Sequence, residues 1–161
     1  MTSKDVINYI EKEGMEKLYK KFEKYFVKVD DWSEQFAMGD LLGEQELSNA
    51  LDVLTGVFMR FSIIAGAIDA YKTNNELSFQ AKEFKNCTGK PNVSQIKEKA
   101  RGSTKELREY RADFLNYALS AEKGICTCQS RLKRLTVAKG AKGVDFTGDV
   151  NNVNNQSGWG K

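Results

Sequence analysis

The feature that most constrains the fold of this sequence is an apolar repeat between Glu44 and Lys85. Its members follow one another at alternating steps of four and three: Leu47, Leu51, Leu54, Phe58, Phe61, Ala65 and Ile68. This spacing is that of one face of an α-helix packed along a seam with another helix. At about 1.5 Å per residue such a helix is on the order of 60 Å long. An isolated helix of that length cannot bury its stripe, so the repeat predicts a partner helix.

A second stretch, from Ser103 to about Ala138, supplies that partner. Its apolar residues also recur at three-four steps, with one extra residue at the join between Ala121 and Ile125: Leu107, Tyr110, Phe114, Tyr117, Ala121, Ile125, Cys128, Leu132 and Leu135. Ser103 and Glu106 have the spacing of a capping box, which predicts a helix start there. Residues between the two stretches carry strong turn signals around Pro91, although 93–101 could form a short helix of its own or extend the next helix.

We therefore predict an all-α fold built on a long antiparallel helical hairpin. Helices are expected at about 3–29, 44–85 and 103–138, the first packed on the hairpin, and residues 1–138 form one domain. Gly14 falls on the apolar face of the first helix and marks either a break or a close contact. Trp32 and Phe36 follow the first helix, whose pattern ends at Asp30 and Asp31, and fit either a core plug or a docking site.

Glycines inside the two long helices predict close approach by a neighbouring helix. Each glycine costs a helix about 1 kcal/mol relative to alanine. Gly56 and Gly66 in the first long helix and Gly124 in the second therefore suggest tight contacts that compensate this cost.

Residues 139–161 change in composition and predict an extended C-terminal tail rich in glycine and asparagine. Apolar residues are nevertheless spaced along this tail, and a purely solvated segment has no need of them. The expected anchors are Phe146, Val150, Val153 and Trp159. Such spacing favours a segment that becomes ordered against a partner, such as a neighbouring subunit.

Charge is distributed unevenly along the chain. Residues 1–60 hold 8 basic and 12 acidic residues, for a net −4, whereas residues 61–161 hold 17 and 10, for a net +7. The basic half indicates an acidic partner, either nucleic acid or an acidic protein face, or head-to-tail packing with the acidic half of another copy. We expect no secretory signal, and no membrane span because charged residues interrupt the apolar runs. Three cysteines without a framework pattern favour a reducing compartment.

The residue types needed for catalysis or metal binding are poorly represented. The chain has no histidine, which removes the commonest general base and metal ligand. Cys126 and Cys128 lie two apart in a predicted helix and would face nearly opposite sides, so they cannot hold one metal ion. We therefore expect a non-enzymatic protein without metal or cofactor.

The most distinctive polar feature is the basic end of the last helix. No acidic residue lies between Glu122 and Asp145, and the cations expected to contact nucleic acid or an acidic partner are Arg131, Lys133, Arg134, Lys139 and Lys142. Cations at a helix C-terminus also interact favourably with the helix dipole, which accounts for part of the pattern. No exposed aromatic residues are interleaved with them, so any nucleic-acid binding would go through the phosphate backbone and would be salt-sensitive.

The segment from Lys105 to Gly140, with its run from Ile125 to Lys133, resembles small helical proteins of tailed bacteriophages. Over the hairpin, roughly residues 47–140, it is similar to UvsY-type recombination mediators, and that similarity implies an oligomeric helical protein that binds single-stranded DNA. The tail is not part of this pattern, and no functional residue is transferred from the family.

Three functions are compatible with these observations. The first is a structural assembly protein of a virion (neck, connector or internal protein), located in the virion or host cytoplasm, that forms a homo-oligomer and contacts other virion proteins. The second is a DNA-binding accessory factor such as a recombination mediator. The third is a small regulator that docks on another protein through Trp32 and Phe36.

Overall fold

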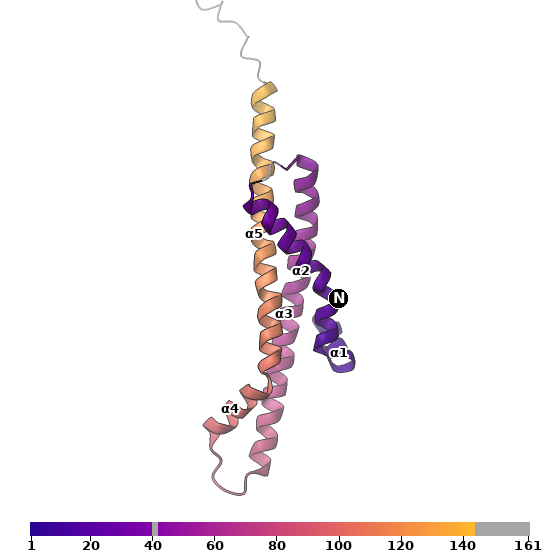
Figure 1. Ribbon diagram of the computed structural model, residues 1–161. Helices are drawn as coiled ribbons and strands as arrows, with labels where there is room; N and C mark the ends of the chain where they lie inside the picture. Colours follow the sequence, from indigo (N-terminus) through magenta and orange to yellow (C-terminus); the bar gives the residue numbers. More distant parts are fainter. Residues whose placement is uncertain (40–41, 144–161) are drawn as a thin grey trace, which may run out of the picture.

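The computed structural model describes residues 1–39 and 42–143, with side chains described as far as Gly140. This part of the chain is entirely α-helical outside its turns, which confirms the predicted all-α fold. The helices are α1 (Ser3–Glu13), α2 (Met15–Ala37), α3 (Glu44–Asn86), α4 (Val93–Ser103) and α5 (Lys105–Gly143). Figure 1 shows α3 and α5 side by side over most of their length, with α1 and α2 crossing one side and α4 leaning away at the turn end.

Pairs of charged residues establish that α3 and α5 run antiparallel. Near the start of α3, Glu44 pairs with Lys139 close to the end of α5. Near the other end of α3, Glu76 pairs with Arg108 in the first turn of α5, at 2.6 Å. Residue numbers rise along α3 while those of the partners in α5 fall, so the predicted antiparallel hairpin is confirmed. Its stripe is the core, because Leu47, Leu54 and Phe61 are all buried.

Aromatic rings fill the middle of the bundle. Phe22 and Phe26 of α2, Phe61 of α3 and Phe114 of α5 form what we call the aromatic cluster, in which Phe61 and Phe114 lie 5.3 Å apart between ring centroids. Phe26 is 5.0 Å from Phe61 and 5.3 Å from Phe114. Burial of large rings is the strongest single source of core stability, and three helices share it here.

The N-terminal region differs from the single predicted helix at 3–29. Gly14 has φ of +89°, a left-handed conformation that glycine adopts without strain, and it separates α1 from α2. Nothing lies within 4 Å of the position that a Cβ would take there, so this glycine makes a break and not a close contact. The predicted end at Asp30 and Asp31 is wrong, because α2 continues to Ala37.

The start and end of the last helix also differ from prediction. Residues 93–103 form a separate helix, and the Ser103 hydroxyl donates to the Ala100 carbonyl oxygen at 2.8 Å, so the expected capping box does not form. At its other end α5 runs to Gly143, five residues past the predicted boundary at 138. The predicted tail anchors Phe146, Val150, Val153 and Trp159 lie outside the described residues.

Of the three glycines predicted to allow close approach by a neighbouring helix, one does so and two do not. Gly124 of α5 is buried, and a Cβ placed on it would lie 2.7 Å from Leu54 Cδ1 of α3, so its prediction of close approach is confirmed. Gly56 and Gly66 have nothing within 4 Å of the corresponding position, so no neighbour within the described chain compensates their cost. Both are exposed, and helical spacing places them on the face of α3 opposite to the buried Leu54 and Phe61.

Candidate functional site

The basic end of α5 is only partly available to a partner. Arg131 Nη2 donates to the Phe36 carbonyl oxygen at 3.2 Å, and the guanidinium lies 5.3 Å from the centroid of the Phe36 ring. The Arg131 side chain therefore satisfies a carbonyl at the C-terminal end of α2 and holds that end against α5. Lys139 pairs with Glu44 at the start of α3.

Lys133 and Arg134 are exposed, and so is Lys139 apart from its contact with Glu44. Of Lys142 the structure describes the helical backbone but not the side chain. Near Arg134 the surface is hollowed by about 420 Å³, with an apolar floor that includes Leu42, Leu47 and Leu135. Apolar surface with a cationic rim suits an acidic, partly apolar protein segment at least as well as a phosphate backbone.

Trp32 and Phe36 serve the fold more than an open docking face. Both are half-buried and pack against the core, with their ring centroids 6.0 Å apart. Phe36 also approaches α5, because its Cε2 lies 3.5 Å from the position that a Cβ on Gly124 would take. This pair therefore fits the core plug considered from the sequence.

A row of exposed apolar residues lies on α3, and it was not predicted from the sequence. Met59 is 60% exposed, Ile63 37% and Leu77 58%, on the side where Gly56 and Gly66 are also exposed. These residues recur at three-four steps, as the core stripe does. The signal was therefore present in the sequence as a second apolar repeat on the opposite face of the same helix. We call the row Gly56, Met59, Ile63, Gly66, Ala70, Thr73 and Leu77 the outer stripe.

The outer stripe makes α3 unusually apolar around its whole circumference. By length and composition the helix could cross a membrane, since an 18-residue window has a mean hydropathy of 1.7, with 39% of the window buried inside the chain. Composition alone therefore does not exclude a span for α3, and the absence of a membrane span stays a prediction. Core helices of proteins pass the same test, and a helix apolar on all sides is typically covered on all sides.

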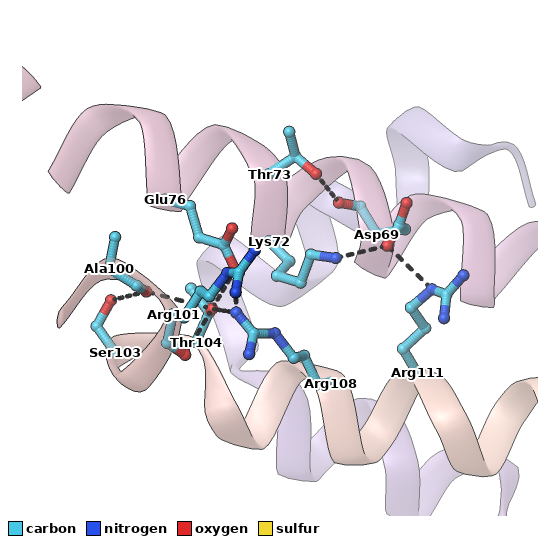
Figure 2. A network of polar contacts seen from close by, with 10 residues as sticks. All are labelled: Asp69, Lys72, Thr73, Glu76, Ala100, Arg101, Ser103, Thr104, Arg108 and Arg111. Atoms are coloured by element: carbon cyan, nitrogen blue, oxygen red, sulfur yellow. Dashed lines mark hydrogen bonds and ion pairs between the residues drawn. The ribbon is translucent and has the colours of Figure 1, made fainter. Parts of the chain in front are cut away.

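At the turn end of the hairpin, Glu76 organises a polar network that was also missed (Figure 2). Glu76 Oε1 accepts from Thr104 Oγ1 and from Arg108 Nη2, each at 2.6 Å. The hydrogen bond from Thr104 and the adjacent Arg108 charge hold the pKa of the Glu76 carboxyl below its ordinary value, although burial opposes the shift. One carboxylate of α3 thus fixes the junction between α4 and α5.

A second carboxylate of α3 extends this network toward the middle of the bundle. Asp69 Oδ1 accepts from Lys72 Nζ at 2.8 Å, and the Lys72 contact is the main cause of the lowered pKa of Asp69. Arg111 Nε lies 3.0 Å from the same oxygen as an ion pair (Figure 2). Arg108 and Arg111, two cations near the start of α5, therefore pair with acids of α3.

Among the described side chains, the cysteines and the acidic residues are the groups that could take part in catalysis or metal binding. Among them no group of three His, Cys, Asp or Glu residues is placed to hold a metal ion. Cys128 is buried in the core, and burial raises the pKa of its thiol, whereas Cys126 is exposed. The two therefore face different surroundings, as the helical spacing predicts, and a buried protonated thiol is a poor nucleophile.

Comparisons with protein-family models, with curated proteins and with solved structures gave no significant match.

Proposed function

We propose that this chain is a non-catalytic structural protein that acts by assembling with further copies of itself and with other proteins. The observation that carries the proposal is the outer stripe of α3. A soluble monomer gains nothing by placing large apolar side chains and helix-destabilising glycines together on one exposed face. In an assembly the same residues become interface core, where small and large apolar groups are favourable.

Within that class, a virion component of a tailed bacteriophage is the specific proposal: a neck, connector or internal protein in the virion or host cytoplasm. The resemblance of residues 105–140 to helical phage proteins supports it. The apolar residues of the C-terminal segment, Phe146 to Trp159, are proposed to anchor on a neighbouring subunit. Long helices suit such roles because they hold subunits at fixed spacing without catalytic loops.

Light scattering at low and high salt, with and without single-stranded DNA, tests the proposal. The expected result is an oligomer whose mass is indifferent to DNA and little affected by salt, because an apolar interface is not screened by ions. A chain that stays monomeric up to high concentration would contradict the assembly role.

A DNA-binding accessory role is the second candidate, favoured by the exposure of Lys133 and Arg134 at the end of α5. Backbone binding should weaken steeply as salt rises, and replacing both residues by alanine should lower the affinity and reduce the salt slope by about two phosphate contacts. Arg131 is left unchanged in this variant because it holds α2 in place. Unchanged affinity for single-stranded DNA would contradict this role.

A further inference from the structure

The outer stripe has an internal order that indicates what covers it. Along α3 its seven positions alternate between steps of three and four, which is the spacing of a two-helix seam. Large residues occupy Met59, Ile63 and Leu77, and small ones occupy Gly56, Gly66 and Ala70. In a packed interface large residues of one surface fit against small residues of the other, so this order restricts the possible partners.

We propose that the outer stripe is covered by the outer stripe of a second copy of this chain, with the two α3 helices antiparallel and the two-fold axis between Ile64 and Ala65. In this arrangement Ile63 of each copy faces Gly66 of the other. Met59 likewise faces Ala70, and Gly56 faces Thr73. Apart from the helix's own neighbouring backbone, no described atom lies within 4 Å of the Cβ positions of Gly56 and Gly66, and at Gly56 this space is part of a hollow that Tyr25 and Lys28 of α2 also line.

A parallel pair would not use the stripe in this way. It would set Met59 against Met59 and Ile63 against Ile63, while Gly66 would face Gly66 and leave a gap. Crowded layers next to empty ones are unfavourable, because both overpacking and cavities cost stability. The antiparallel pair places a small residue opposite Met59 and opposite Ile63, whereas Leu77 lies beyond the paired part of the stripe.

Charges around the stripe favour a protein partner over a lipid bilayer. Arg60 and Asp69 flank it on α3, and the neighbouring α2 carries exposed Lys24 and Lys28. Burying such groups in hydrocarbon costs about 3 kcal/mol for each charge near the bilayer centre. At the rim of a protein interface they stay in water. Asp69 is already paired with Lys72 and Arg111, and Arg60 lies 5.7 Å from the centroid of the Tyr25 ring.

The size of the surface predicts a reversible dimer. In the paired segment, from Gly56 to Thr73, the stripe runs about 25 Å along the helix and about 10 Å across it, which gives about 250 Å² on each copy. This is less than half of the about 800 Å² that each partner of a typical specific interface buries, and it lies in the range of weak, transient contacts. We therefore expect a weak dimer that dissociates readily on dilution. This inference rests on the proposed assembly function and specifies the face and geometry of one of its contacts.

The test compares Met59→Glu with Val27→Glu in the full chain. Val27, on α2, is 54% exposed and lies off the stripe, so the two variants introduce the same charge at similar exposure. Sedimentation over a concentration series should show at least a tenfold weaker dimer for Met59→Glu and no change for Val27→Glu. Circular dichroism should show that both variants keep the helical content of the wild type.

Cysteine cross-linking fixes the orientation, in a background where exposed Cys87 and Cys126 are serine. Ile63→Cys should form a disulfide between copies, because the two positions lie about 4.5 Å apart along the axis of an antiparallel pair. Leu77→Cys should not, because its two copies are on the order of 40 Å apart in that pair. Cross-linking of Leu77→Cys would overturn the antiparallel arrangement.

Two further outcomes separate this inference from the general proposal. If the wild type is oligomeric and Met59→Glu leaves its mass unchanged, the outer stripe is not the interface, although assembly stands. If the wild type is monomeric at all concentrations, both fail. Truncation after Gly143 and flotation with phosphatidylcholine vesicles complete the test. Two results would overturn a second copy as the occupant. One is a monomeric wild type in which Met59 is shielded from solvent only when residues 144–161 are present. The other is a monomeric wild type that floats with vesicles and no longer floats when Met59 is replaced by glutamate.

Discussion

In the middle of the bundle the aromatic cluster fills the space between α2, α3 and α5, whereas at the turn end a single carboxylate, Glu76, ties α3 to α4 and α5. Packing of rings is non-directional and depends on the volume filled. The Glu76 contacts depend on charge, geometry and pH. The comparison shows that one helix uses two different means to hold its partners at two points along its length. The two regions should therefore respond differently to substitution and to acid.

Removal of a ring should have the largest effect. Phe114→Ala leaves a cavity among three other rings, and we expect the free energy of unfolding to fall by about 3–5 kcal/mol. Urea unfolding followed by circular dichroism measures this. Leu119→Ala, on an exposed position of the same helix, should change stability by well under 1 kcal/mol. Similar losses for both variants would mean that the cluster is not the centre of the core.

A smaller effect is expected at the turn end. Glu76→Gln keeps the size of the side chain but removes the charge that Thr104 and Arg108 contact, and we expect a loss of about 1–2 kcal/mol at pH 7. Glu83→Gln is the matched control, because its contact with Lys99 is longer, at 3.9 Å, and exposed. A loss at position 76 no greater than at position 83 would show that the network contributes no more than a surface ion pair.

Two glycines test how far the tight packing extends beyond the rings. In Gly124→Ala the new Cβ would meet the buried Leu54 side chain, so we expect a net loss of about 1 kcal/mol after the gain in helix propensity. Gly56→Ala meets nothing in the described chain and should gain about 1 kcal/mol. Thermal unfolding at concentrations where the chain is monomeric compares them. Equal shifts of the melting temperature in the same direction for both variants would contradict the difference in packing.

Acid should remove the contribution of Glu76 and leave that of the rings. The pKa of Glu76 is lower in the folded chain than its ordinary value of 4.5, so its contribution is present above that pH and is lost as pH falls through the folded pKa. The stability difference between the wild type and Glu76→Gln should therefore shrink as the pH falls from 4.5 through the lower pKa of the folded chain. The difference for Phe114→Ala should stay constant over that range, as urea titrations at each pH would reveal.

The sequence predicted what is periodic and local. The hairpin, its core stripe and the burial of Phe61, Phe114 and Cys128 all follow from three-four spacing within one helix. Contacts between Glu76, Thr104 and Arg108 could not be predicted in this way, because they join residues about thirty apart whose polar types are common on any helix surface. Gly124 was predicted correctly and Gly66 was not, since sequence alone does not say which side of a glycine another helix occupies.

The antiparallel pairing of α3 and α5 has a consequence for how the chain folds. The Glu76–Arg108 contact closes a loop of 32 residues, whereas the Glu44–Lys139 contact closes one of 95. Loop-closure entropy alone makes the longer closure about 1 kcal/mol more costly. Once the turn end has formed, each further layer of the hairpin closes only a short additional segment. We therefore expect the hairpin to zip from α4 toward the start of α3, so that substitutions near Thr104 slow folding and substitutions near Leu47 mainly speed unfolding.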